Sequence, residues 1–339
     1  MKRMTNVILL SSAGFALTLV LMGIWILWVI VIMEHSTYSI VALDPDTGDV
    51  GIAGASCVPI SAGAMATFVP GKGAAVTQAA FTPQNQSKVF DLLLQGASAE
   101  EIISFMSDEA YDANADIRQY GVVTLSGADV QVAGYTGSDN NYWAGDSQDR
   151  EMAVSVQGNT LAGPAVVADA LDAFRSNSQG ELELSDRLLR ALEAASAAGG
   201  DKRCNHDDFQ QTAQAAFIAV SKADQLPYKA SLVKDPAAND PSRPWLYISV
   251  IEAKGGPNPL VGLRTEYDQW RIESLPPCPS CDLEAIPVPT GGGARPIAKA
   301  LLQITNRIGL WGLGVGCLAA GLLIALTILF LILRRRVRA

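Results

Sequence analysis

TYSIVALDPDTGDVGIAGAS, residues 37–56, has the pattern of two strands joined by a tight turn. Residues 38–43 and 50–56 are the strand-like runs, and DPDTG at 44–48 has typical turn chemistry. We therefore expect an antiparallel hairpin. Thr37, at its start, would be an N-terminal nucleophile if the chain were cut just before it, because its free α-amine could serve as the base for its hydroxyl.

Outward from this hairpin, strand-like and helix-like segments alternate in blocks. Antiparallel strands in blocks, with paired helices between them, favour an α+β layered fold. Near-continuous apolar strands such as 215–220 suggest sheets that are covered on both faces. The further strands are expected at 74–78, 119–125, 130–135, 152–156, 213–220 and 245–251, and the helices at 84–95, 99–107, 164–175, 185–198 and 260–271.

Long uncharged apolar segments lie near both ends of the chain, at 7–33 and 308–333. Each exceeds the roughly 20 residues that a membrane-crossing helix needs, so both are predicted to be transmembrane helices. A signal peptide is the alternative for the first, but its apolar run is longer than that class requires. Basic residues in the short ends 1–6 and 334–339 predict that both termini are cytoplasmic. The chain is thus expected in the cell membrane, with its main domain outside the cytoplasm.

Between the predicted spans, one folded domain is expected at 36–274, followed by a Pro/Gly-rich stalk at 275–307. This region holds all 34 acidic residues and 19 of the 25 basic ones, a formal charge of −15. Such a charge argues against nucleic acid and against an anionic membrane surface as partners. Self-association stays open, because Gly312, Gly316 and Ala320 have the four-residue spacing of helix packing.

Seven segments, in order along the chain, resemble a bacterial and archaeal family of unknown function, family 1028, which is grouped with the N-terminal nucleophile (Ntn) hydrolases. The resemblance covers about residues 36–271. It implies a four-layer αββα sandwich with a nucleophile at the position of Thr37, and it implies no particular substrate. The segments are 37–45, 51–56, 73–79, 118–123, 155–159, 199–203 and 214–216.

Thr37 is the main candidate for catalysis, and the resemblance points to an Ntn-type amidohydrolase that acts on an amide or peptide. The reaction requires a cut between Ser36 and Thr37; a cut after His35 would expose Ser36 instead. The alternative is that Thr37 is an ordinary strand residue, since threonine is favoured in strands. With an intact chain, the domain would bind a ligand or partner in the same cleft without cleaving it.

Other polar residues are candidates for lining this site. Gln78, Gln157 and Asn159 lie at predicted strand ends, where their amides could stabilise an oxyanion or satisfy buried backbone groups. Asp201 and Arg203 follow a Gly-Gly turn. Arg203 could capture a substrate carboxylate, or it could pair with Asp201 and pin the loop.

Four of the five cysteines predict disulfides rather than a metal site, and Cys317, within the second predicted span, is interpreted as a small apolar residue. Outside the cytoplasm, Cys57 and Cys204 could form a disulfide that ties the second strand to the Arg203 loop. Cys278 and Cys281 form a C-x-x-C pair, for which a small local disulfide is favoured. The sequence HDD at 206–208 is interpreted as a solvated loop rather than a metal-ligand cluster. No metal and no cofactor are expected, because no motif for either is present.

Overall fold

The computed structural model describes residues 37–59, 62–176, 182–205, 210–230, 235–278 and 284–292. Its central hairpin consists of strands β1 (Thr37–Leu43) and β2 (Val50–Ser56), and every residue of both strands is buried. The strands pair antiparallel, with Tyr38 opposite Ala55. Asp44 holds the turn, because its carboxylate accepts hydrogen bonds from the backbone N–H groups of Asp46 and Thr47. The predicted hairpin is confirmed.

The hairpin lies in the middle of a six-stranded antiparallel sheet with the order β11-β9-β2-β1-β8-β7. A second antiparallel sheet of five strands has the order β10-β3-β4-β5-β6. The remaining strands of the first sheet are β7 (Trp143–Asp149), β8 (Val154–Leu161), β9 (Ala215–Ser221) and β11 (Leu246–Ile251). Those of the second are β3 (Ala66–Val69), β4 (Gly73–Gln78), β5 (Gln119–Ser126), β6 (Asp129–Thr136) and β10 (Tyr228–Lys229).

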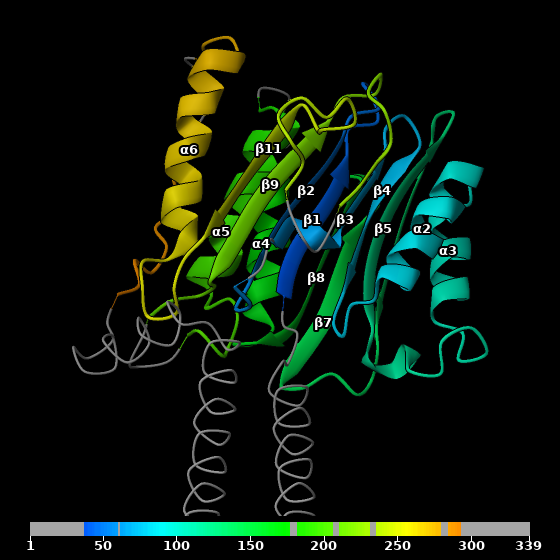
Figure 1. The fold of residues 1–339 in the computed structure, drawn as a ribbon, viewed down its shortest axis with the longest axis horizontal. Helices are drawn as coiled ribbons and strands as arrows, with labels where there is room; N and C mark the ends of the chain where they lie inside the picture. Colours follow the sequence, from blue (N-terminus) through cyan, green and yellow to red (C-terminus); the bar gives the residue numbers. More distant parts are fainter. Residues whose placement is uncertain are drawn as a thin grey trace, which may run out of the picture.

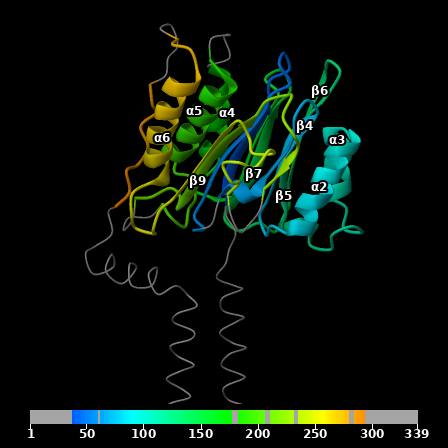
Figure 2. The same cartoon turned by 45° about the horizontal axis from the view of Figure 1, so that its top comes forward.

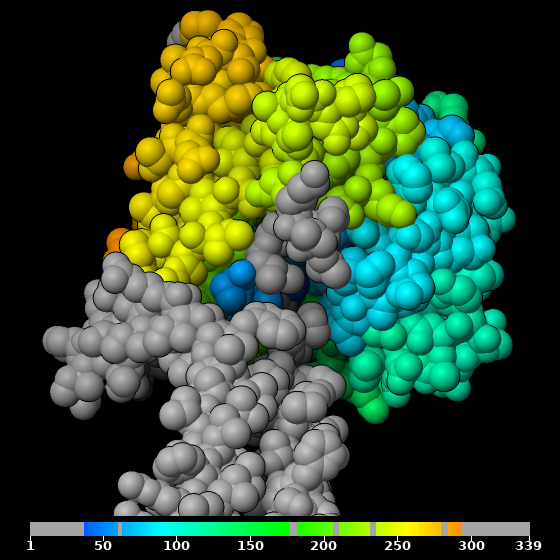
Figure 3. Space-filling view, in the orientation of Figure 1, coloured from blue at the N-terminus to red at the C-terminus, as the bar shows by residue number. Residues whose placement is uncertain are grey.

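Helices cover the outer faces of both sheets (Figures 1 and 2). The six-stranded sheet carries α4 (Ala165–Ser176), α5 (Leu184–Ala197) and α6 (Pro259–Ser274), and the five-stranded sheet carries α2 (Pro83–Gln95) and α3 (Ala99–Met106). In the space-filling view, α6 in yellow and orange and the α2–α3 pair in cyan form opposite flanks (Figure 3). Short 3-10 helices η1 (Ala62–Met65) and η2 (Ala115–Ile117) complete the described elements.

The core consists of three apolar clusters, which follow the alternation of side chains along the strands. In β1, Tyr38, Ile40 and Ala42 pack toward α4, α5 and α6. Val41 and Leu43 point the other way, into the space between the two sheets. Thr37 and Ser39 share the parity of Val41, so the same alternation turns both toward the five-stranded sheet.

The predicted fold class, an αββα sandwich flanked by two transmembrane helices, needs correction. What the structure supports is a mixed fold of helices and two antiparallel sheets. In the part of the chain that it describes, no helix combines the length and the apolar character that a membrane crossing requires. The predicted spans 7–33 and 308–333, and the terminal segments 1–6 and 334–339, fall outside the described residues. The structure therefore does not support the two flanking transmembrane helices in the predicted fold class.

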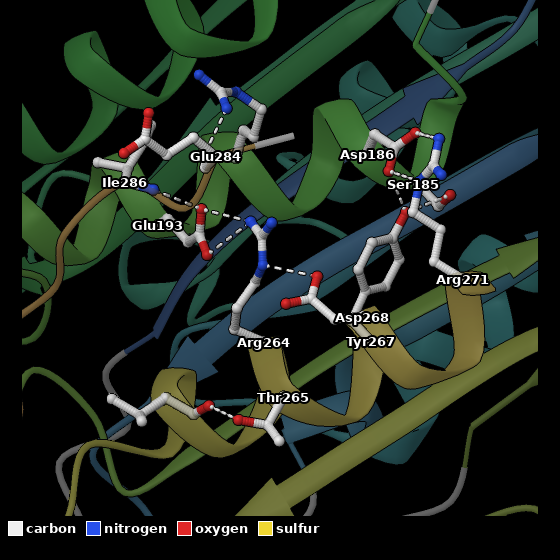
Figure 4. A network of polar contacts seen from close by, with 12 residues as sticks. Ser185, Asp186, Glu193, Arg264, Thr265, Tyr267, Asp268, Arg271, Glu284 and Ile286 are labelled. Carbon is white, nitrogen blue, oxygen red and sulfur yellow. Dashed lines mark hydrogen bonds and ion pairs between the residues drawn. The ribbon is translucent and has the colours of Figure 1, made fainter. Parts of the chain in front are cut away.

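Residues 284–292, within the stretch predicted as a stalk, contact the helix layer of the six-stranded sheet. The Ile286 N–H donates a 3.1 Å hydrogen bond to Glu193 of α5 (Figure 4). Further along, the Asn258 side chain, which caps α6, donates to the Pro289 carbonyl at 2.7 Å. Val288 packs against the apolar cluster beneath. This stretch therefore extends the domain past α6.

Candidate functional site

Thr37 is the first residue of β1, an interior strand of the six-stranded sheet, and only 7% of it is exposed. In the β1–β8 ladder Thr37 lies opposite Asn159. The strand alternation turns its side chain toward the five-stranded sheet, as it does for Ser39. Ser36, the other candidate nucleophile, lies outside the described residues. The site is therefore built from the ends of strands in both sheets.

Gln78, the last residue of β4, connects the five-stranded sheet to the start of β1. Its side-chain N–H donates to the Thr37 carbonyl at 3.4 Å and to Gln119 Oε1 at 2.7 Å. Its oxygen accepts a 2.6 Å hydrogen bond from the Ser39 hydroxyl. All four residues are buried. The Gln78 amide thus fixes the first residues of β1 against the second sheet.

Gln119, the first residue of β5, is the centre of the same network. Its Oε1 also accepts a hydrogen bond from Asn159 Nδ2 at 3.0 Å. Its Nε2 donates to the Gly158 carbonyl at 2.9 Å and to Thr136 Oγ1 at 2.8 Å. Gln119 was not among the predicted site residues. The available signal was a glutamine at a strand end, which it shares with Gln78.

Gln157 lies deeper between the sheets than Asn159. Its side-chain N–H donates to the Ser39 hydroxyl at 2.7 Å, and its oxygen accepts from Ser155 at 2.8 Å. Gly121 leaves room for it, because a Cβ at that position would overlap the Gln157 amide. The structure therefore brings Thr37, Gln78, Gln157 and Asn159 together. The side-chain N–H groups of the three amides donate to protein oxygens, which is typical of positioning side chains.

Asp201 lies at the same end of the six-stranded sheet. It is fully buried, and its carboxylate accepts hydrogen bonds from the Cys57 N–H at 2.8 Å and from Arg203 Nη2 at 2.9 Å. The neighbouring Lys202 N–H donates to the Thr160 carbonyl at 3.0 Å, directly after Asn159. The loop is pinned by these contacts, including the predicted Asp201–Arg203 ion pair. Capture of a substrate carboxylate by Arg203 stays a prediction.

A disulfide joins Cys57, just after β2, to Cys204 in the same loop. The predicted pairing is confirmed. Cys278 is also disulfide-bonded, while Cys281 lies outside the described residues, as does the 206–208 sequence. Across the described ranges, no group of three or more histidine, cysteine or acidic residues is placed to hold a metal ion.

The backbone near Thr37 contains non-glycine residues in the left-handed region. Thr160 has φ +55°, and Ala79 and Ala80, directly after Gln78, have φ +50° and +42°. Such conformations cost of order 1–3 kcal/mol each and cluster at functional sites. The Ala80 carbonyl accepts a hydrogen bond from Arg118, which is paired with Asp112 at 2.8 Å. The turn after Gln78 is therefore strained and held from outside.

Asp112 and Tyr38 are ionisable groups next to this arrangement. The hydrogen bond from Arg118, assisted by one from Asn85, lowers the pKa of Asp112 to about 2. Burial raises the pKa of Tyr38, so its phenol stays protonated at neutral pH. Gly200 lies against the Tyr38 ring, which places the Asp201 loop beside β1 on the helix side of the sheet. The charged pair thus acts on the turn after Gln78, and the Asp201 loop packs beside the start of β1.

A small hollow lies between α5 and α6, away from Thr37. It is lined by apolar and paired charged side chains that belong to the contacts between these helices (Figure 4). Asp186, for example, is bonded there to Tyr267 and Arg271. We therefore keep the Thr37 end of the two sheets as the candidate site.

Comparisons with known proteins support the family resemblance and go no further. No curated protein matches the chain. A solved structure, that of protein SPO2555 from Silicibacter pomeroyi, is 22% identical, with a TM-score of 0.52 over 70% of this chain and 89% of that one. That likeness shows the fold, and neither comparison extends to the Ntn grouping. The model of the family of unknown function DUF1028 matches residues 37–250, and the chain belongs to this family.

Proposed function

We propose that the mature protein is an Ntn-type amide hydrolase with Thr37 as its nucleophile. The observation that carries the proposal is the place of Thr37: it opens an interior strand and faces an inter-sheet cluster of buried amides. Cleavage of the Ser36–Thr37 peptide would give Thr37 a free α-amine. In this proposal the substrate reaches Thr37 from the end of the inter-sheet space.

In the proposed reaction, Thr37 Oγ1 attacks the carbonyl carbon of an amide while the α-amine accepts the hydroxyl proton. The C–N bond then breaks, and the leaving amine takes that proton. A water molecule, with the α-amine of Thr37 as its base, then hydrolyses the resulting ester and restores the threonine. Gln78 and Asn159 act as positioning residues, because their amides hold the Thr37 carbonyl and Gln119.

Location outside the cytoplasm is a second part of the proposal. The Cys57–Cys204 disulfide supports it, because structural disulfides persist mainly in oxidising compartments. The competing function is that of a binding module with the same fold. In that case the Ser36–Thr37 peptide stays intact and the hydroxyl has no adjacent base.

The first prediction concerns the N-terminal residue of the purified protein, measured by mass spectrometry. We expect the main species to begin at Thr37. Thr37→Ala should abolish this cleavage, and Thr37→Ser should retain it, because serine keeps the hydroxyl that self-processing uses. A chain that begins at Ser36 would transfer the nucleophile to that residue. A mature chain that runs unbroken through Ser36–Thr37 would instead support the binding module.

A further inference from the structure

Tyr142 is an unusual residue at the same end of the molecule. Its side chain is 66% exposed, and its backbone has φ +55°. A left-handed conformation is a genuine outlier for a bulky residue and costs of order 1–3 kcal/mol. Exposure of so large an apolar ring gains little stability in return. A strained backbone that displays an aromatic ring to solvent is therefore a candidate for binding.

The β6–β7 loop, residues 137–142, carries this tyrosine from one sheet to the other. It leaves β6 next to Thr136, a contact of Gln119, and enters β7 at Trp143. Trp143 lies opposite Leu161 in β8, just past the Asn159 that faces Thr37. The loop therefore borders the Thr37 end of the inter-sheet space.

Strand spacing gives the separation between the loop and the nucleophile. In β8, Asn159 lies between Thr37 on one side and the 143–145 segment of β7 on the other. Adjacent strands are about 4.8 Å apart, so Thr37 and this segment are roughly 10 Å apart. A β-bulge falls between Trp143 and Gly145, a device that re-aims side chains near active sites. Tyr142 directly precedes this segment in the chain.

Both ends of the loop are held in place. The Gly137 and Asp139 N–H groups donate to the carbonyls of Arg118 and Asp116, both at 2.9 Å. At the other end, Trp143 packs against the apolar core and over Gly145. The ring of Tyr142 is therefore presented on an anchored backbone, which lowers the entropy lost on binding.

The surroundings of Tyr142 indicate the class of ligand. The loop sequence before it, GSDNN, has no aliphatic side chain, and its single charge is the acidic Asp139. A neutral pyranose combines an apolar CH face, which suits an aromatic ring, with a rim of hydroxyls, which suits serine and asparagine side chains. An anionic ligand would be repelled by a domain this acidic. An amide substituent on the sugar would supply the bond that Thr37 attacks.

We propose that Tyr142 stacks on the ring of an uncharged N-acylated amino sugar and so selects the substrate of the Thr37 site. The effect on substrate choice rests on the proposed amide hydrolase, whereas binding of the sugar to Tyr142 does not depend on it. The Tyr142 ring is a specificity element on the rim of the site, and the loop fixes its distance from the nucleophile.

The test is calorimetric titration of the full chain with N,N′-diacetylchitobiose, in the wild type and in Thr37→Ala in parallel. We expect the sugar to bind and Tyr142→Phe to keep the affinity. Tyr142→Ala should weaken binding about tenfold, which corresponds to ~1.4 kcal/mol. Leu226→Ala, an exposed residue beyond the far end of β9, is the matched control and should change nothing.

Thermal melting separates binding from a structural role. Tyr142→Gly removes both the ring and the strain, so it should raise the Tm while it weakens sugar binding. A structural tyrosine would lower the Tm instead. The proposal is overturned if the wild type does not bind the sugar, if Tyr142→Ala binds it equally well, or if N-acetylphenylalanine amide binds in preference.

The outcomes also separate this proposal from the proposed function. If the sugar binds in a Tyr142-dependent way but the chain is never cut before Thr37, the binding site is supported and the hydrolase proposal is refuted. If the chain begins at Thr37 but does not bind the sugar, the hydrolase proposal is supported and the sugar site at Tyr142 is refuted.

Discussion

At the scale of single residues, Asp112 and Arg118 hold the strained turn that follows Gln78. Arg118 donates to Asp112 at 2.8 Å and also to the Ala80 carbonyl. Asn85 supports Asp112 with a 2.7 Å hydrogen bond. These contacts thus connect α2, through the Asp112–Arg118 ion pair, to Ala80 in the strained turn.

This ion pair gives a prediction about acid stability. The pKa of Asp112 is lowered to about 2, chiefly by the hydrogen bond from Arg118. A lowered folded-state pKa stabilises the protein above the unfolded pKa of about 4, and the contribution is lost as the pH falls toward 2. The free energy of unfolding of the wild type should therefore exceed that of Asp112→Asn most above pH 4, and this difference should shrink as the pH falls through 2, as measured by urea denaturation at several pH values.

Arg118→Met is the control for that experiment, because it removes the main cause of the lowered pKa. In this background, the pH dependence of the Asp112→Asn effect should be much weaker. If the difference in the free energy of unfolding between wild type and Asp112→Asn stayed constant from pH 4 to pH 2, the assignment of the pH dependence to the Asp112–Arg118 pair would be contradicted.

The residues of the candidate site differ in how far the sequence could predict them. Gln78, Gln157 and Asn159 could be named because each is a polar residue that follows apolar strand residues. The predicted strand end before Gln157 was wrong, because β8 runs on to Leu161 and contains both Gln157 and Asn159. Gln119 has the same local pattern, but its importance comes from the alignment of β5 with β1 and β8 across two sheets. Tyr142 carried no local signal, because its strain and exposure exist only in the folded loop. The roles of Gln119 and Tyr142 thus depend on how segments that are distant in the sequence are arranged in the fold.

At the scale of elements, α5 and α6 are joined by buried charged contacts (Figure 4). The Asp186 carboxylate accepts hydrogen bonds from Arg271 Nε at 2.7 Å and from the Tyr267 hydroxyl at 2.8 Å. The Tyr267 oxygen in turn accepts a 2.8 Å hydrogen bond from the Ser185 hydroxyl. Only 1% of the Asp186 side chain and 11% of the Arg271 side chain are exposed. The pair is thus removed from water, and each charge depends on the other.

We predict that Asp186→Ala lowers the free energy of unfolding by about 3–5 kcal/mol, because it leaves the Arg271 charge buried without its partner. The double variant Asp186→Leu/Arg271→Met should recover most of this loss, since it removes both charges. Urea denaturation and a double-mutant cycle measure the coupling. Asp129→Ala, which breaks the exposed pair with Arg150, is the control and should barely move the midpoint. A loss for Asp186→Ala no larger than that of the control would refute the prediction.

Most elements could be predicted from local patterns, and the exceptions have physical reasons. The expected helices and the hairpin are present within a few residues of their predicted bounds. Strand β7, with the sequence WAGDSQD, was missed because it is a half-buried edge strand without apolar alternation. Strands β3 and β10 were missed because they are only four and two residues long. Edge and short strands form through their neighbours, so their own sequences indicate little.

At the scale of the whole molecule, the Cys57–Cys204 disulfide links regions that are 147 residues apart in the sequence. It connects the end of β2 with the Asp201 loop, beside the first residue of β1. In the chain-entropy model, closing a loop of this length stabilises a protein by up to about 5 kcal/mol, and 2–4 kcal/mol is typical. The bond therefore stabilises the fold and the candidate site together.

We predict that Cys57→Ala/Cys204→Ala lowers the free energy of unfolding by about 2–5 kcal/mol, as measured by urea denaturation. Dithiothreitol should destabilise the wild type more than the double variant, because only the wild type has this bond to lose. Hydrogen exchange should rise first at residues 201–205, at Cys57 after β2, whose N–H Asp201 holds, and at the neighbouring start of β1. Equal losses with dithiothreitol in both proteins, or faster exchange only in α2 and α3, would show that the disulfide does not hold the Thr37 end together.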